Sequence, residues 1–166
     1  QAPIKYSDIP RITYGFSGSV NWKNFDFSFL FSGIAKASRV YTGWGATEFG
    51  LVGFYSDYHL QAWTAERYAN GEEIKYPALA SSPGTSQKAN DFFIMDRSFL
   101  RLKNIELGYT LPKKLLKKVG INSTRVYVNG NNLLTWKAMK TDAIDPEQSA
   151  ELNYPITKMM NFGINV

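Results

Sequence analysis

The alternation of apolar and polar side chains within residues 12–35 constrains the fold of this chain more than any other feature. Residues 12–22 place apolar side chains at nearly every second position, with small polar side chains between them. Lys23 and Asn24 interrupt the pattern, which then restarts with a row of phenylalanines: Phe25, Phe27, Phe29 and Phe31. A period of two residues is that of a β-strand, so the region predicts a hairpin. Four such rings in line would form an exposed apolar stripe in water, so a second sheet or lipid must cover them.

Three further stretches have strand character, and the chain is therefore expected to be all-β. Aromatic residues make up 15% of the sequence, which suits pleated, half-buried surfaces better than helices. Within 91–110 the apolar residues change parity. Either a β-bulge falls near Lys103 and Asn104, or Arg101 and Lys103 face outward near a polar interface. The expected strands lie near residues 11–22, 24–35, 91–110, 124–136 and 156–166.

The connections between these strands are alternately short and long. Residues 23–24 and 111–123 form short connections, whereas 36–90 and 137–154 are long and rich in glycine or polar residues. Outer-membrane barrels have short periplasmic turns and long external loops. No apolar run is long enough for a transmembrane helix, but a barrel strand needs only about 9 to 11 residues of alternating character. The pattern favours a membrane barrel with extracellular loops at 36–90 and 137–154.

No set of residues suggests catalysis, a cofactor or a bound metal. The chain has no cysteine, and its only histidine, His59, has no metal-ligand spacing around it. Asp142, Asp145 and Glu147 lie close together but lack the glycine-centred spacing of a calcium loop, so a turn at the Asp-Pro pair is favoured. We expect no catalytic residue and no metal site, and the chain is not expected to be an enzyme.

Two polar runs are interpreted in structural terms. The net charge of +5 is spread along the chain except in "LPKKLLKKVG", and no aromatic-basic motif accompanies it, so nucleic-acid binding is not expected. That run is too short for strong membrane-surface binding and is interpreted as a charged periplasmic turn. Asn129, Asn131 and Asn132 could contact a ligand, but a bend or a bond to neighbouring backbone is favoured.

Four ordered motifs resemble a known family. Over residues 96–166 they are "FLRLKNIELGYTLP", "RVYVNGNNLLTW", "DPE" and "YPITKMMNFGINV", and a weaker match runs through "PRITYGFSGSVNWKNFDFSFLFSG". In this order they resemble the C-terminal end of a SusC/RagA-type TonB-dependent outer-membrane transporter. The resemblance implies that residues 1–166 are the last strands, an antiparallel meander, of a transmembrane β-barrel of the 22-stranded plugged type. The plug domain and the earlier strands would be absent from this chain.

The resemblance also implies a function and a set of partners. Such transporters import oligosaccharides or peptides through the outer membrane of a Gram-negative bacterium, pair with a SusD-like surface lipoprotein, and draw energy from TonB. TonB would be contacted through the missing N-terminal part. The sequence departs from the family at its end, because the chain stops at Val166 without the usual terminal aromatic residue. The alternative is a soluble all-β glycan-binding module, which predicts comparable loops at both ends of a sandwich.

Two groups of candidate residues follow. Aromatic side chains in the expected loop 36–90 offer surfaces for contact with a substrate or a partner protein. The alternative is that they are buried in a small core of the loop itself. These candidates are Trp44, Tyr55, Tyr58, Trp63, Tyr68 and Tyr76. The side chains expected to face outer-membrane lipid are Phe25, Phe27, Phe29, Phe31, Phe162 and Ile164.

Overall fold

In the computed structural model the chain forms two compact units, each built from three segments. The sheet unit consists of Ile12–Ile34, Phe99–Lys137 and Ile156–Val166. The loop unit consists of Gln1–Arg11, Ala35–Ser98 and Ala138–Pro155. The structure describes residues 6–41, 48, 55, 57–80, 84, 88, 90–117, 120–142, 144–148, 154 and 156–166.

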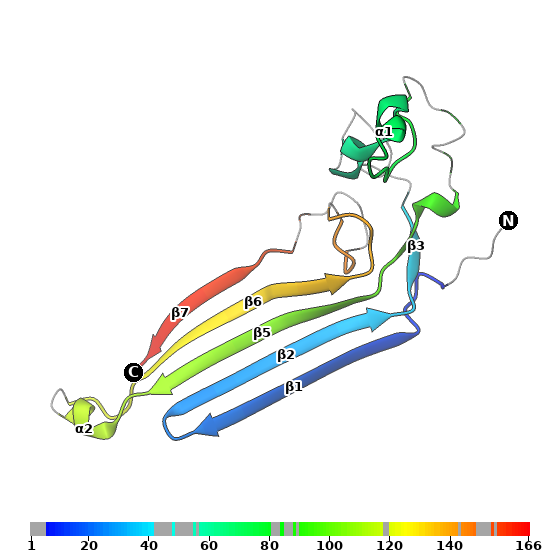
Figure 1. The fold of residues 1–166 in the computed structure, drawn as a ribbon. Coiled ribbons are helices and arrows are strands. Elements are labelled where there is room, and N and C mark those ends of the chain that lie inside the picture. The colour runs from blue at the N-terminus through cyan, green and yellow to red at the C-terminus, as the bar shows by residue number, and fades with distance from the viewer. Residues whose placement is uncertain are drawn as a thin grey trace. The chain divides into compact units, whose positions relative to one another are not determined.

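The sheet unit is a five-stranded meander (Figure 1). The ladders between β2 and β5, between β5 and β6, and between β6 and β7 are all antiparallel, which confirms the predicted meander. Its strands are β1 (Ile12–Trp22), β2 (Phe25–Ala35), β5 (Phe99–Thr110), β6 (Arg125–Lys137) and β7 (Met159–Asn165), in the spatial order β1-β2-β5-β6-β7.

The two short connections of the sheet are formed differently. Between β1 and β2 the chain reverses over two residues, and Lys23 takes a left-handed backbone with φ of 56°. Between β5 and β6 the chain forms the single helical turn α2 (Lys113–Leu116), which starts directly after Pro112. Proline suits that place because it has no backbone N–H to leave unpaired. Leu116 is buried and anchors the turn.

A bulge explains the change of parity in the middle of the sheet. Phe31 pairs with Leu102 and Leu30 with Asn104, so Lys103 is an extra residue opposite β2. β6 compensates with its own irregularity, where Asn132 adopts φ of 54°. Asparagine tolerates this left-handed conformation better than most residues. The bulge alternative from the sequence is therefore confirmed.

The strand expected over 91–110 is divided in the structure. Its first part becomes the 3-10 turn η3 (Asp91–Phe93) and the short strand β4 (Ile94–Asp96), which pairs with β3 (Ser38–Val40). The Asp96 carboxylate accepts a 2.8 Å hydrogen bond from the Ser98 backbone N–H. Such a side-chain turn competes with strand pairing and ends β4 before β5 begins.

The loop unit has small cores of its own. One buried cluster contains Tyr41, Met95, Met139 and Ile144, and a second contains Ala62, Tyr76 and Phe93, with Phe92 packed against it. Short helical elements lie in this unit, namely η1 (Asp57–Gln61) and α1 (Ala65–Ala69). Thr64 caps α1 by accepting a 3.1 Å hydrogen bond from the Arg67 N–H. Among the described residues, no helix has the length and apolar character needed to cross a membrane.

Candidate functional site

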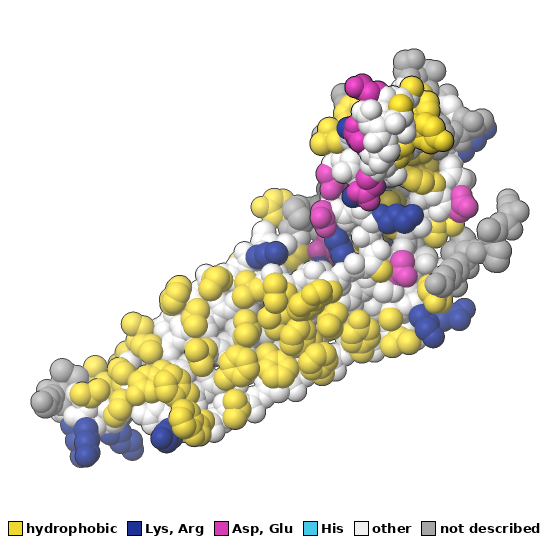
Figure 2. Space-filling model, in the orientation of Figure 1, with side chains coloured by type: hydrophobic (Ala, Val, Ile, Leu, Met, Phe, Trp, Pro, Cys, Tyr) yellow, Lys and Arg dark blue, Asp and Glu magenta, His cyan; other side chains and the backbone are white. Residues whose placement is uncertain are grey.

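One face of the sheet unit is apolar across its strands. The register aligns Phe25 with Tyr109 and Phe27 with Leu107, and the rows continue on β6 and β7 through Val126 to Ile164 and through Val128 to Phe162. Phe16 of β1 stacks on Phe31 at a ring separation of 4.8 Å. Figure 2 shows hydrophobic side chains gathered over the strands. Phe25 is 44% exposed and Phe162 is 84% exposed in this chain.

The side chains predicted to face lipid therefore share one face of one sheet. They are Phe25, Phe27, Phe29, Phe31, Phe162 and Ile164. Contact of these residues with lipid stays a prediction.

The opposite face of the sheet is polar, and its side chains bond across the strands. Asn161 Nδ2 donates to Asn129 Oδ1 at 2.9 Å, and Asn104 Nδ2 donates to Asn131 Oδ1 at 3.0 Å. Asn132, at the bulge, donates to the backbone oxygen of Thr157 at 3.3 Å. For Asn132 the predicted bend and backbone bond are confirmed.

An ionic cluster centred on Arg125 joins three strands on this polar face. Arg125 Nε lies 3.0 Å from Asp26 Oδ2, and Arg125 Nη2 lies 2.6 Å from Glu106 Oε1. The guanidinium also lies over the Tyr127 ring, 5.0 Å from its centroid. Gly108 makes room for the cluster, because a Cβ there would collide with the Arg125 guanidinium and the Asp26 carboxylate. The polar face of the sheet therefore carries charged side chains in fixed positions.

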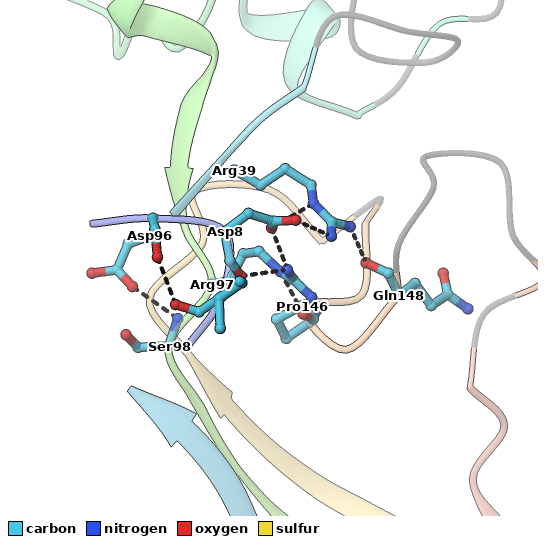
Figure 3. A network of polar contacts seen from close by, with 9 residues as sticks. Asp8, Arg39, Asp96, Arg97, Ser98, Pro146 and Gln148 are labelled. Carbon is cyan, nitrogen blue, oxygen red and sulfur yellow. Dashed lines mark hydrogen bonds and ion pairs between the residues drawn. The ribbon is translucent and has the colours of Figure 1, made fainter. Parts of the chain in front are cut away.

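A second ionic network holds the loop unit together (Figure 3). Asp8 accepts bonds from Arg39 at 2.6 and 2.7 Å and from Arg97 at 2.6 Å. Arg97 also donates to the Pro146 backbone oxygen at 3.1 Å, and its side chain is only 9% exposed. Arg39 donates to the Gln148 backbone oxygen at 3.2 Å. The network thus joins four segments that are distant in sequence.

The same contacts set the ionisation of Asp8. The pKa of the Asp8 carboxyl is lowered, first by the hydrogen bond from Arg39, while burial opposes the shift and the hydrogen bond from Arg97 adds to it. Charge-assisted hydrogen bonds favour the ionised carboxylate. Asp8 therefore stays charged at neutral pH and serves as the shared acceptor of both arginines.

A cavity of about 620 Å³ opens in the loop unit. Its walls come from an extended segment around Tyr76, from η3 and β4, and from the segment after β6. This volume is in the ordinary range for small-ligand pockets. Its lining is mainly apolar, and the residues are Trp63, Glu73, Ile74, Lys75, Tyr76, Pro77, Ala78, Phe92, Met95, Lys140 and Thr141.

The loop aromatics predicted as contact candidates separate into exposed and buried side chains. Tyr55 and Tyr68 are 65% and 72% exposed, and Trp63 is 44% exposed and lines the cavity. Tyr76 is 2% exposed, and its hydroxyl donates a 2.5 Å hydrogen bond to Glu48. Tyr76 is therefore part of the loop's own core. Trp44 and the side chain of Tyr58 lie outside the described residues.

The polar residues weighed for metal binding have structural roles where they are described. His59 is buried, and its ring lies 4.3 Å from the Tyr76 ring, centroid to centroid. The Asp145 carboxylate accepts a 2.9 Å hydrogen bond from the Glu147 N–H, which confirms the predicted turn at this Asp-Pro pair. Among the described residues there is no group of three His, Cys, Asp or Glu side chains that could hold a metal ion.

Sequence reasoning missed the Asp8 network and the cavity. Asp8 lies 31 residues from Arg39 and 89 from Arg97, so no local spacing signals their contact. The cavity likewise combines Trp63 with Phe92 and Lys140. In the sequence, only the aromatic side chains of the expected loop 36–90 pointed to this region.

Comparison with known proteins provides two curated relatives, both from Formosa agariphila. TonB-dependent receptor P26 is 27% identical over 181 aligned positions, which cover 99% of this chain and 18% of the receptor. TonB-dependent receptor P3 is 32% identical over 146 positions, which cover 87% of this chain and 13% of the receptor. The chain thus spans less than a fifth of either relative's length. No family model matches the chain.

Solved structures of the RagAB system share this fold. The structure of the RagAB peptide transporter matches with a TM-score of 0.69 and 30% identity, over 97% of this chain and 18% of that one. The RagAB peptide importer in its "open-open" state matches with a TM-score of 0.66 and 30% identity, over 96% and 17%. The five-stranded antiparallel sheet therefore matches part of the barrel of a TonB-dependent transporter. These relatives are transporters and receptors, not enzymes.

Proposed function

We propose that this chain, which belongs to the SusC/RagA family of TonB-dependent receptors, forms part of an outer-membrane transporter that imports oligosaccharides or peptides into a Gram-negative bacterium. The main support for this proposal is the difference between the two faces of the sheet. A sheet with one continuous apolar face and one hydrogen-bonded polar face suits a barrel wall between lipid and a wet lumen. In the soluble alternative a second sheet would have to cover the apolar face, yet Phe25 and Phe162 remain exposed.

In this proposal the apolar face meets outer-membrane lipid and the polar face lines the barrel interior. Phe25, Phe27, Phe29 and Phe31 would lie at successive depths of the hydrocarbon layer on β2, with Phe162 and Ile164 on β7. The Arg125 cluster would then lie inside the barrel, where charged groups contact water rather than lipid. This arrangement leaves no ionised side chain of the cluster in hydrocarbon, where each would be costly.

The long connections 36–90 and 137–154 are proposed to lie outside the cell, and the turns at Lys23 and α2 in the periplasm. External loops are the long ones in outer-membrane barrels. A loop unit with its own buried clusters and ionic network can present a fixed surface to a partner. TonB would act through parts of the receptor outside these 166 residues.

The proposed partner at the loop unit is a SusD-like surface lipoprotein, with the substrate as the second candidate. Tyr55 and Tyr68 support this, because both rings are largely exposed and neither belongs to a buried cluster among the described residues. Exposed tyrosines are frequent anchors in protein interfaces. RagAB, which shares the fold, is a peptide importer, and this supports peptides as one candidate substrate.

The test replaces Tyr55 and Tyr68 with serine in the complete transporter. Deletion of residues 60–85 would be less informative, because it would remove Ala62 and Tyr76 from a core. The double variant should reach the outer membrane normally but co-purify less lipoprotein and import less nutrient. Leu115→Ser is the control, since Leu115 is exposed on the proposed periplasmic turn. If the double variant bound the lipoprotein and imported nutrient normally, the loop unit would have no role in partner or substrate contact.

A further inference from the structure

The cavity of the loop unit offers a ligand mainly apolar surface, and the two hydroxyl groups of its wall already have hydrogen-bond partners. The Tyr76 hydroxyl donates to Glu48, and the Thr141 hydroxyl donates to Asp57 at 2.9 Å. The remaining wall is formed largely by Ile74, Pro77, Ala78, Phe92 and Met95, together with the Trp63 ring. An apolar group that leaves water for this cavity gains free energy in proportion to the area it buries.

The two lysines that line the cavity, Lys75 and Lys140, differ in their ionic partners. Lys75 Nζ lies 3.2 Å from Glu73 Oε2, so these two side chains compensate each other. Lys140 also lines the cavity and has no ion pair within the part of the chain that the structure describes. A ligand that combines an apolar body with one negative charge is therefore complementary to this site.

We propose that the cavity binds the C-terminal end of a peptide whose last residue has a large apolar side chain, and that Lys140 contacts its terminal carboxylate. The cavity is large enough to hold the terminal side chain together with part of the preceding residue. This inference rests on the proposed function, since it specifies the class of substrate that an importer of this kind would first capture at its loops. It selects peptides over oligosaccharides for this site.

The chemistry of the wall disfavours a sugar here. Each buried sugar hydroxyl needs a hydrogen-bond partner, and a polar group buried without one costs free energy. Tyr76 and Thr141 have already committed their hydroxyl protons, while Ile74, Pro77, Ala78, Phe92 and Met95 contribute apolar side chains. A phenylalanine or leucine side chain has no such requirement.

Direct binding to the purified complete transporter tests the proposal. The probe is a short fluorescent peptide that ends in phenylalanine, compared with the same peptide carrying a C-terminal amide and with one that ends in glycine. Each change should weaken binding by about tenfold or more, since one lost charge contact or one lost apolar side chain is commonly worth that factor. Equal binding of all three peptides would overturn the proposal, as would stronger competition by an acidic oligosaccharide than by the parent peptide.

Two pairs of variants locate the binding in the cavity. Ala78→Trp fills the cavity from an exposed position in its wall, and Ala80→Trp makes the same change two residues away, outside the lining. Lys140→Gln removes the unpaired cation, and Lys88→Gln removes an exposed lysine elsewhere in the loop unit. Ala78→Trp and Lys140→Gln should weaken binding about tenfold, whereas each control binds as the parent does. If either cavity variant binds as its control does, the cavity is not the site.

Failure of this inference and failure of the proposed function give different results. If the transporter imports peptides but Ala78→Trp and Lys140→Gln leave binding unchanged, the function stands and the cavity site is wrong. If the purified transporter binds the peptide as predicted but cells import none, the site stands and the import function is wrong. Binding and uptake are therefore measured on the same set of variants.

Discussion

The sheet unit and the loop unit place their apolar side chains in opposite ways. In the sheet unit, phenylalanines and aliphatic residues form rows on one face and many remain exposed, including Phe25 and Phe162. In the loop unit, Tyr41, Phe93 and Ile144 are fully or almost fully buried in small clusters. The loop unit therefore satisfies its hydrophobic residues within itself, whereas the sheet unit depends on an apolar environment outside the chain.

Their polar contacts differ in range as well. On the sheet, polar side chains bond mainly to the adjacent strand, as Asn161 does with Asn129. In the loop unit, Arg97 reaches both Asp8 and the oxygen of Pro146, which lie far apart in sequence. On the sheet, strand pairing brings the bonding partners together, including the charged partners of Arg125, while the loop unit needs specific charged residues to hold its segments in place. The two units should therefore respond to different substitutions.

The largest effect is expected from a charge on the apolar face. Phe27→Arg should destabilise the complete transporter in lipid by about 2 to 4 kcal/mol if position 27 lies near the membrane midplane. The free energy of unfolding from lipid vesicles in urea measures this. Ser28→Arg is the matched control, because Ser28 is on the polar face and should lose much less stability. Equal losses at both positions would mean that the two faces do not differ in environment, and the comparison would fail.

Close backbone packing in the sheet gives the next effect. A Cβ at Gly33 would overlap the Phe99 carbonyl oxygen and lie 2.8 Å from the Tyr14 ring. Because the obstacle includes backbone, Gly33→Ala should destabilise the sheet by about 1 to 3 kcal/mol in the same unfolding experiment. Gly15→Ala is the milder control, since its Cβ would lie 3.3 Å from the Phe31 oxygen. Similar losses for both variants would show that the sheet yields at Gly33.

In the loop unit the corresponding test is the buried arginine. Arg97→Gln removes the bonds to Asp8 and weakens the contact with the Pro146 oxygen, which should cost about 1 to 2 kcal/mol locally. Hydrogen exchange of the Ser38 amide, which donates to the Ser7 backbone oxygen at 2.9 Å, would report the loosening. Arg39→Gln should have a smaller effect, because Arg39 is more exposed. Faster exchange on the sheet as well would show that the two units are not independent in stability.

Sequence periodicity was sufficient for the sheet because strand pairing is regular. The alternation around Phe25 to Phe31 predicted both the shared face and the hairpin, and the parity change near Lys103 indicated a bulge as one of two alternatives. The choice between these alternatives required the register of both neighbouring strands. Asn132 adopts the left-handed backbone at the irregularity of β6, and the sequence indicated only that the chain could bend there.

The loop unit could not be predicted to the same extent because its contacts are not periodic. Residues 91–96 alternate like a strand that continues into β5, yet Phe93 and Met95 are buried in loop-unit clusters and Asp96 ends the strand. The aromatic content of 36–90 identified the region of the cavity. Which rings are exposed and which are buried depends on packing between distant segments, as the contact between Tyr76 and Glu48 illustrates.

The smallest expected effect concerns the pH dependence of the loop unit. The hydrogen bond from Arg39, with that from Arg97, lowers the pKa of Asp8 in the folded state, against the effect of burial. A carboxyl with a lowered folded pKa stabilises the fold at pH values above its ordinary pKa, and this contribution is lost as the pH falls through that value towards the lowered one. Because the Asp8 side chain is about half exposed, at 51%, solvent screens the contribution and it should be small.

The protection factor of the Ser38 amide, compared between neutral and acidic pH, measures this contribution. Protection should decrease on acidification in the parent protein, and Asp8→Asn should be less protected at neutral pH but change less with pH. Added salt should reduce the difference between the two proteins, since it screens partly exposed charges. An Asp8→Asn variant with the parent's full pH dependence would assign the effect to another carboxylate, and the pH dependence of the loop unit would then not come from the Asp8 network.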